Sequence, residues 1–435
     1  MDNTRSDLDY KQQTNYQGDI VNYFSEYIRP RHIHDDNTSC VLEIAGSAFS
    51  CSFDECVLSV SYKVERKGPN GWVKLEHRLA DGTVGPDATV APIQNILESL
   101  FTQYDVVCQN KVISESTGIY PYTAYLVKLL NYSRDAKDTY LTLSGWESDT
   151  SNSVDDTTVT NLGFKKRRDR IFNSREDTVV GVLYSDLAYA LAMVPSHTDI
   201  TLVLHKAKPE FVLQGGASAI TYRVNITNVE LEARKYELSP KLNQTIEKQL
   251  STTGSIPFKH LSTTNHYVPI GSSTFQINRL VLGQLPLRIV FGIVKNDTFS
   301  GDVEKSPYNF KRHGVTEYQL AIDGRTVPQR PVQVTNFIEP YLNLFRHTGQ
   351  FCTNQTSGIT FDQFKDSYCL HVINLRGDQD NRTDIYPHRA RGTMSLRINF
   401  EDATTEGLTI VVLAEYENTY LIDRLRNITS DHSIH

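Results

Sequence analysis

The sequence contains no apolar run that approaches the ~20 residues needed to cross a bilayer, so we expect no membrane span. Its first 16 residues, MDNTRSDLDYKQQTNY, have no hydrophobic core and do not resemble a signal peptide. The six cysteines form no CxxC pair and no disulfide-dense pattern, which argues against a secreted disulfide scaffold. Reduced thiols in the cytosol or nucleus are therefore expected at Cys40, Cys51, Cys56, Cys108, Cys352 and Cys369.

Catalytic motifs are equally scarce. A Gly-x-Ser-x-Gly elbow, a P-loop, an HExxH helix and a Rossmann fingerprint are all missing. His32 and His34 would share one side of a strand, but a surface pair beside a Pro-Arg turn is commoner than a metal site. Residues 378–384 resemble a calcium loop, yet the sixth-position glycine is missing and Arg389 stands at the twelfth position. The sequence therefore predicts no enzyme activity, no metal and no cofactor.

Methionine is rare as well, with 3 residues against 23 tyrosines and 18 phenylalanines, and this balance favours β structure. The 435 residues exceed one ordinary core and predict two domains of roughly 200 residues each. The net charge of −7, from 44 basic and 51 acidic residues, gives no general attraction to nucleic acid or membranes. We therefore expect no sequence-specific nucleic-acid partner.

What the chain does contain is a stretch that occurs twice. The first copy, residues 104–131, reads YDVVCQNKVISESTGIYPYTAYLVKLLN, and the second, residues 318–346, reads YQLAIDGRTVPQRPVQVTNFIEPYLNLFR. Each copy predicts a short alternating strand, a two-residue turn, a return strand, a polar loop and an amphipathic helix. The turn pairs are Gln-Asn and Asp-Gly, and Asp-Gly is among the strongest hairpin signals because both positions tolerate positive φ.

The spacing of the two copies carries the domain prediction. Asn110 and Gly324 are 214 residues apart, and Tyr125 and Tyr341 are 216 apart. A nearly constant offset of half the chain predicts the duplication of a whole domain. Many short strands, long loops and a few helices make a pair of β-sandwiches the expected architecture.

Several helices are predicted outside the repeat. Residues 19–30 predict a short helix, which would either dock on a neighbouring subunit or pack on its own domain. Its apolar face would carry Ile20, Tyr23, Phe24, Tyr27 and Ile28. Pro92 is expected to open a second helix that reaches Phe101, and Ser239-Pro240 a third that links the two domains.

The strands between these helices are predicted from alternation and from apolar runs. Residues 220–233 change phase near Thr227-Asn228, where a bulge would restore the buried face. Residues 287–294, LRIVFGIV, are apolar on both faces and predict a central strand.

An acidic segment and a basic cluster lie side by side in the first half. Residues 147–161 predict an exposed loop because they are low in apolar content. The cluster that follows suggests a nuclear-localisation signal, a nucleic-acid contact or a plain solvated loop. It consists of Lys165, Lys166, Arg167, Arg168 and Arg170.

The predicted organisation follows from these elements. It comprises an N-terminal arm with a short helix (1–36), a first sandwich (37–238), a linker helix (239–256), a second sandwich (257–426) and a tail (427–435).

Three segments of the chain carry a further signal: LFTQYDVVCQNKVISESTGIYPYTAYLVKLLNYSRDAKDTYLTLSGW, LGQLPLRIVFGIVKNDTFSGDVEKSPYNFKRHGV and the terminal EYENTYLIDRLRNI. They resemble the major capsid proteins of Polinton (Maverick) elements and adintoviruses. The resemblance covers much of the chain from about residue 90 to residue 428, and it includes no catalytic motif.

The resemblance implies an all-β protein with a few helices that is built from two tandem jelly-roll β-sandwiches, as in adenovirus hexons. It also implies homotrimers that tile an icosahedral shell, with penton and minor capsid proteins as further partners. The protein would then reside in the virion, after synthesis in the host cytosol and assembly in the nucleus. Two alternatives stay open: a two-domain β-sandwich attachment protein of the lectin type, and a cupin-like enzyme.

Overall fold

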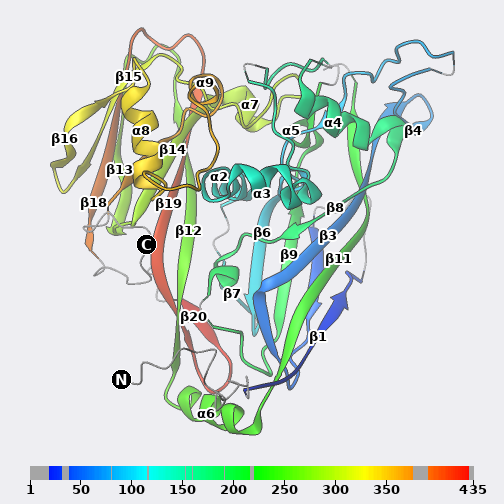
Figure 1. The fold of residues 1–435 in the computed structure, drawn as a ribbon, viewed down its shortest axis with the longest axis vertical. Helices are drawn as coiled ribbons and strands as arrows, with labels where there is room; N and C mark the ends of the chain where they lie inside the picture. Colours follow the sequence, from blue (N-terminus) through cyan, green and yellow to red (C-terminus); the bar gives the residue numbers. More distant parts are fainter. Residues whose placement is uncertain are drawn as a thin grey trace, which may run out of the picture.

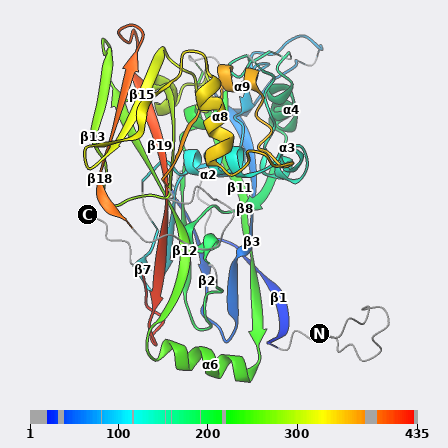
Figure 2. The same cartoon turned by 60° about the vertical axis from the view of Figure 1, so that its left-hand side comes forward.

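The computed structural model describes residues 19–31, 39–79, 81–114, 117–151, 153–158, 160–190, 192–215, 220–375 and 390–430. Two β-sandwiches stand side by side, and their longest strands run along the long axis of the molecule (Figures 1 and 2). Helix α6 (Pro240–Leu250) crosses one end and joins the last strand of the first sandwich to the first strand of the second. A helix begins here as predicted from Ser239-Pro240, but it ends at Leu250, short of the predicted residue 256, because a strand begins at Gly254. The Ser239 side chain caps the helix by accepting the Leu242 N–H.

The first sandwich has two antiparallel sheets. One sheet has the order β1 (Ile20–Ile28), β11 (Tyr222–Leu238), β3 (Ser50–Gly68), with β4 (Gly71–Lys74) and β8 (Asp177–Val182) both pairing with β3. The other has the order β2 (Ser39–Ile44), β9 (Ile200–Lys206), β6 (Phe101–Cys108), β7 (Lys111–Val112). The pairing of β11 with β3 shifts between Ile226 and Asn228, so the predicted bulge is confirmed.

The second sandwich also has two antiparallel sheets. One has the order β12 (Gly254–Val268), β19 (Leu408–Ile422), β14 (Arg288–Lys295), β17 (His371–Asn374), with β20 (Ile428–Ser430) added to β19. The other has the order β13 (Thr274–Gln284), β18 (Arg391–Phe400), β15 (Val315–Ile322), β16 (Arg325–Gln333).

The two sandwiches share one topology. With β4, β5 (Ala91–Pro92), β10 (Leu213–Gln214) and β20 set aside, the described residues of each half form eight strands. Numbering these strands in chain order gives sheets 1-8-3-6 and 2-7-4-5 in both halves. Eight strands arranged in this way form a jelly roll. The fold is therefore a double jelly roll, as the sequence resemblance implied.

The stretch that occurs twice occupies the same place in both jelly rolls. The hairpins β6–β7 and β15–β16 are strands 4 and 5 of their halves, and they are followed by α2 (Tyr120–Asn131) and α8 (Ile338–His347). Both turns use two residues with positive φ, at Gln109 and Asn110 (47° and 64°) and at Asp323 and Gly324 (48° and 79°). This geometry matches the twist of the flanking strands, so both predicted hairpins and helices are confirmed.

One sheet of the second jelly roll is buried on both faces. On β14, Ile289, Phe291 and Ile293 face the core inside the second sandwich, whereas Val290 and Val294 belong to a core shared with the first sandwich. Strand β14 lies between β19 and β17, so the prediction of a central strand from an apolar run is confirmed.

The helix predicted for residues 19–30 is wrong, because this segment forms strand β1. Strand β1 pairs with β11 over its whole length, with Phe24 inward against Phe49 and Tyr23 and Tyr27 outward. Isoleucine, valine and aromatic residues suit both a helical stripe and a half-buried strand. The ladder that β11 offers decides between the two structures.

The helix predicted from Pro92 to Phe101 is also wrong over most of its length. Only Ile96–Ser99 forms a helix (α1), while Pro92 lies in β5 and Phe101 begins β6. Asn95 has a left-handed conformation, with φ of 63°, and every residue from Val90 to Phe101 is buried. An apolar spacing indicates a helix only when one face of the segment is buried and the other is exposed. Here the whole segment is buried, so the spacing carried no such information.

The remaining elements are short. They are α3 (Arg134–Asp138), η2 (Tyr140–Ser144), α4 (Leu162–Arg170), η3 (Phe172–Ser174), η4 (Asp186–Tyr189), α5 (Pro209–Val212), α7 (Asn296–Ser300) and α9 (Phe361–Asp366).

Candidate functional site: the junction between the jelly rolls

Helix α2 is the central element of the junction. It contacts β6 of the first jelly roll and β12 and β19 of the second, and it lies between the two sandwiches in both views (Figures 1 and 2). All of its residues from Tyr120 to Leu130 are buried. The sequence predicted an amphipathic helix, but the second jelly roll covers the face that would otherwise meet solvent.

Aromatic rings fill the space beside α2. The ring of Tyr125 stacks on Tyr308, with centroids 4.0 Å apart and an interplanar angle of 2°, and on Trp146 at 5.3 Å. Tyr122 stacks on Phe299 at 5.3 Å and donates its hydroxyl hydrogen bond to the Pro307 carbonyl. Tyr308, Pro307 and Phe299 belong to the second half, so these contacts connect the two jelly rolls through large, rigid side chains.

A buried ion pair lies one turn along α2 from Tyr125, because Lys128 follows it at the i+3 position. Lys128 Nζ is 2.7 Å from Glu98 Oε1, and it also donates to Asn95 Oδ1 and Ser144 Oγ. Desolvation lowers the pKa of Lys128 and raises the pKa of Glu98, while their mutual attraction opposes both shifts. The pair fixes α2 against α1 and η2.

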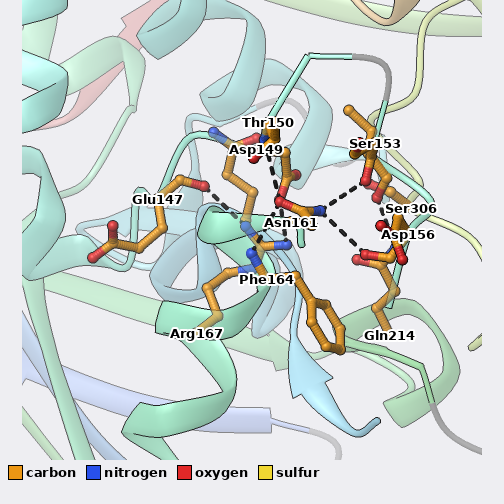
Figure 3. A network of polar contacts seen from close by, with 12 residues as sticks. Glu147, Asp149, Thr150, Ser153, Asp156, Asn161, Phe164, Arg167, Gln214 and Ser306 are labelled. Carbon is orange, nitrogen blue, oxygen red and sulfur yellow. Dashed lines mark hydrogen bonds and ion pairs between the residues drawn. The ribbon is translucent and has the colours of Figure 1, made fainter. Parts of the chain in front are cut away.

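A polar network extends the junction toward α4 (Figure 3). Arg167 Nη2 is 2.8 Å from Asp149 Oδ1, and its other nitrogens donate to the carbonyls of Pro92 and Glu147. Asn161 donates to the carbonyls of Ser153 and Asp156 and accepts the N–H groups of Thr150 and Phe164. The segment that connects Trp146 to α4 is thereby folded around the buried side chains of Arg167 and Asn161.

The same segment reaches the second jelly roll. Asp155 accepts the backbone N–H of Ser306 at 2.9 Å and the side-chain amide of Asn309 at 2.5 Å. Asp149 and Asn161 are buried, so the prediction that residues 147–161 form an exposed loop is wrong at its anchoring positions. Two of the acidic residues that suggested solvent exposure are bound within the junction, Asp149 by Arg167 and Asp155 by Ser306 and Asn309.

The basic cluster lies on α4, but its members face different surroundings. Arg167 is 1% exposed, and Arg170 is half-buried and paired with Asp177 at 2.8 Å. Lys165 and Lys166 are exposed, and Arg168 pairs with the adjacent Asp169. The five cations therefore do not form one continuous surface.

The segment expected to dock on a neighbouring subunit or to pack on its own domain is divided by the alternation of β1 into an exposed and a buried face. Val21, Tyr23 and Tyr27 are each more than 60% exposed on its outer face, whereas Ile28 is buried. The Arg234 guanidinium lies 5.4 Å from the Tyr23 ring centroid.

The two candidate metal segments, His32 with His34 and residues 378–384, lie outside the described residues. Within the part of the chain that the structure describes, no group of three or more His, Cys, Asp or Glu side chains is arranged to hold a metal. No helix in that part is long and apolar enough to cross a membrane.

Sequence reasoning missed the junction. Lys128 in the apolar run YLVKLLN was a usable signal, because a lysine inside a buried helix requires a buried partner. Tyr308 and Asp155 lie in irregular segments, where no periodic pattern marks them.

Comparison with known proteins places the fold in a class. The chain has a TM-score of 0.63 with a chain of the Sputnik virophage, at 9% identity, covering 99% of this chain and 93% of that one. The mavirus major capsid protein gives a TM-score of 0.57 at 13% identity, covering 100% of this chain and 94% of that one. The capsid of the virus PBCV-1 gives a TM-score of 0.58 at 10% identity, covering 97% of this chain and 99% of that one. The structural neighbours are double jelly-roll major capsid proteins of virophages and large DNA viruses.

Sequence comparison adds one relative and no family. An uncharacterised protein of Caenorhabditis elegans is 24% identical over 348 residues, which cover 78% of this chain and 81% of the relative. No protein-family model matches the chain.

Proposed function

We propose that this chain is a major capsid protein whose homotrimers form the pseudo-hexagonal units of an icosahedral shell. The observation that carries the proposal is the recurrence of one eight-strand topology in both halves. Three copies around a threefold axis present six similar jelly rolls, so a trimer can occupy a position of sixfold symmetry.

The junction supports this role. A capsomer must hold its two jelly rolls at one fixed angle, because the edges of the unit have to match those of its neighbours. The stacked rings of Tyr125 and Tyr308 and the contacts of Asp155 give the two halves a continuous buried interface. A flexible linker would provide no such constraint.

We further infer that the capsid is of the Polinton or adintovirus type, and that the protein resides in the virion. The three quoted segments support this origin, and so does a relative of similar extent in an animal, as an element resident in animal genomes would leave. Penton and minor capsid proteins would complete the shell.

Light scattering and electron microscopy test the proposal on the purified full-length chain. The expected mass is three times 49.3 kDa at low micromolar concentration, with particles of hexagonal outline that close into shells under assembly conditions. A stable monomer, or a monomer that binds glycans, would contradict the proposal and favour an attachment protein.

A further inference from the structure

Strand β3 contains a large bulge opposite β11. Val57 pairs with Glu232, and Ser52 pairs with Arg234, so a step of five residues on β3 faces a step of two on β11. The difference, 5 − 2 = 3, is three extra residues on β3. A bulge of this size redirects the side chains on either side of it.

The bulge brings two cysteines together. In a regular strand, Cys51 and Cys56 would point to opposite faces and lie roughly 17 Å apart, because side chains alternate and each residue advances about 3.3 Å. Here both side chains enter the same core, where they are 5% and 2% exposed. Their thiols hydrogen-bond to each other, and both cysteines are free.

The two sulfurs have different surroundings. The Cys56 thiol donates to the Ser52 carbonyl at 3.4 Å, so its sulfur lies beside the residue that follows Cys51. Cys56 Sγ also accepts hydrogen bonds from the Cys51 thiol and from the backbone N–H of Arg234, and the first of these is the main reason that its pKa is lowered. The same thiol–thiol bond is the main reason that the pKa of Cys51 is raised. Cys56 also follows directly after Asp54 and Glu55, which are exposed at the tip of the bulge. The carboxylates of Asp54 and Glu55 oppose the lowering of the Cys56 pKa, but the pKa still shifts downward, so Cys56 forms the thiolate more readily than Cys51.

We propose that Cys51 and Cys56 are a redox-active dithiol that closes to an intramolecular disulfide on contact with a small disulfide such as oxidised glutathione. The Cys56 thiolate attacks one sulfur of oxidised glutathione, forms a mixed disulfide and releases one glutathione thiolate, which takes up the proton that Cys56 lost. Cys51 then loses its proton and attacks Cys56 Sγ, and the second glutathione leaves as a thiol. The two protein thiols are oxidised by two electrons, and the glutathione disulfide is reduced by two.

The disulfide would lock the bulge of β3 against β11, the strand that pairs with β1 on its other side. A chain made in reducing cytosol would carry the open dithiol, and the same chain in an oxidising medium would carry the closed form. The inference depends on the geometry of β3 alone and does not require the capsid proposal.

The test exposes the folded, reduced full-length chain to buffers of increasing oxidised-to-reduced glutathione ratio, followed by acid quenching, alkylation and peptide mass spectrometry. The peptide that contains both residues is expected to lose two hydrogens at a ratio that leaves Cys108 and Cys369 as thiols. Cys352 is exposed and reports within the same sample that the reagent is active. The same titration on the urea-unfolded chain shows whether the native fold promotes closure.

Two variants identify the attacking sulfur. Cys51→Ser is expected to accumulate one glutathione on Cys56, whereas Cys56→Ser leaves Cys51 as a thiol under the same conditions. Native Cys51 and Cys56 that stay reduced while Cys352 reacts would overturn the proposal. Closure no more favourable in the folded chain than in the unfolded one would also overturn it.

Discussion

At the scale of residues, the junction depends on charges that are fully removed from water. Lys128 and Glu98 compensate each other inside the protein, so the loss of one partner leaves the other as an isolated buried charge. We expect Lys128→Met to lower the free energy of unfolding by about 3–5 kcal/mol, the usual cost of breaking a buried pair. The double variant Lys128→Met/Glu98→Leu is expected to recover most of that loss, as measured by urea unfolding. A double variant that is less stable than Lys128→Met would show that the pair itself, with its bonds to Asn95 and Ser144, stabilises the fold.

A buried histidine makes the second jelly roll sensitive to acid. His371 lies against Phe291 and Tyr318, and desolvation lowers its pKa to about 3 from an ordinary value of 6.5. Below pH 6.5 the unfolded chain takes up a proton that the folded chain does not, so stability falls as the pH falls toward 3. At pH 5 we expect His371 to lower the free energy of unfolding by about 2 kcal/mol, because each pH unit below 6.5 changes that free energy by about 1.36 kcal/mol.

The measurement is urea unfolding of the wild type and of His371→Phe at pH 7 and pH 5. The phenylalanine keeps the ring contacts and removes the titrating group, so the variant should lose less stability on acidification. The exposed His197, replaced by Asn, is the matched control and should follow the wild type. Equal losses in the wild type and His371→Phe would assign the acid sensitivity to other groups. Burial also lowers the pKa of His313, to about 4, so some acid sensitivity persists in the variant.

At the scale of elements, the sequence predicted those parts whose structure is local. The hairpins at Gln109-Asn110 and Asp323-Gly324, the helices α2 and α8 and the capped linker α6 all follow from turn residues, proline positions and periodicity. Strand β1 was mistaken for a helix because its partner β11 lies about 200 residues away, and pairing at that distance leaves no local signal. The junction escaped prediction for the same reason, since Tyr125 and Tyr308 come from different halves.

The alternation of β1 separates a contact surface from the core. We propose that its outer face contacts neighbouring capsomers, because Tyr23 and Tyr27 are large side chains that are more than 60% exposed. Tyr23→Ser/Tyr27→Ser is expected to leave the unfolding midpoint nearly unchanged and to reduce shell yield in electron micrographs. Phe24→Ser, on the inner face against Phe49, should instead destabilise the fold. Normal shells from the double variant would remove β1 from the inter-capsomer contact.

The basic cluster on helix α4 has exposed and buried members, so the hypothesis that it is a nuclear-localisation signal can be tested on the exposed members alone. Replacing all five cations would remove Arg167, which is buried on Asp149, and would confound import with folding. Lys165→Ala/Lys166→Ala changes only exposed side chains and is expected to reduce nuclear accumulation of a fluorescent fusion. The matched control is Lys241→Ala/Lys248→Ala on α6, which also removes two exposed lysines from a helix. Unchanged distribution of the α4 variant would leave these lysines as a solvated face.

At the scale of the whole molecule, the two jelly rolls act as one rigid unit only if the junction holds, and the trimer that we propose requires one fixed angle between them. Tyr308→Ala removes the ring stacked on Tyr125, and Tyr318→Ala removes an equally buried ring from the core inside the second jelly roll. Both variants delete the same atoms, and each is expected to cost about 3–5 kcal/mol of stability. We expect Tyr308→Ala to shift mass toward the monomer in light scattering at low micromolar concentration while Tyr318→Ala stays trimeric. Equal dissociation of the two variants would mean that trimers depend on overall stability, and the junction would then have no special part in assembly.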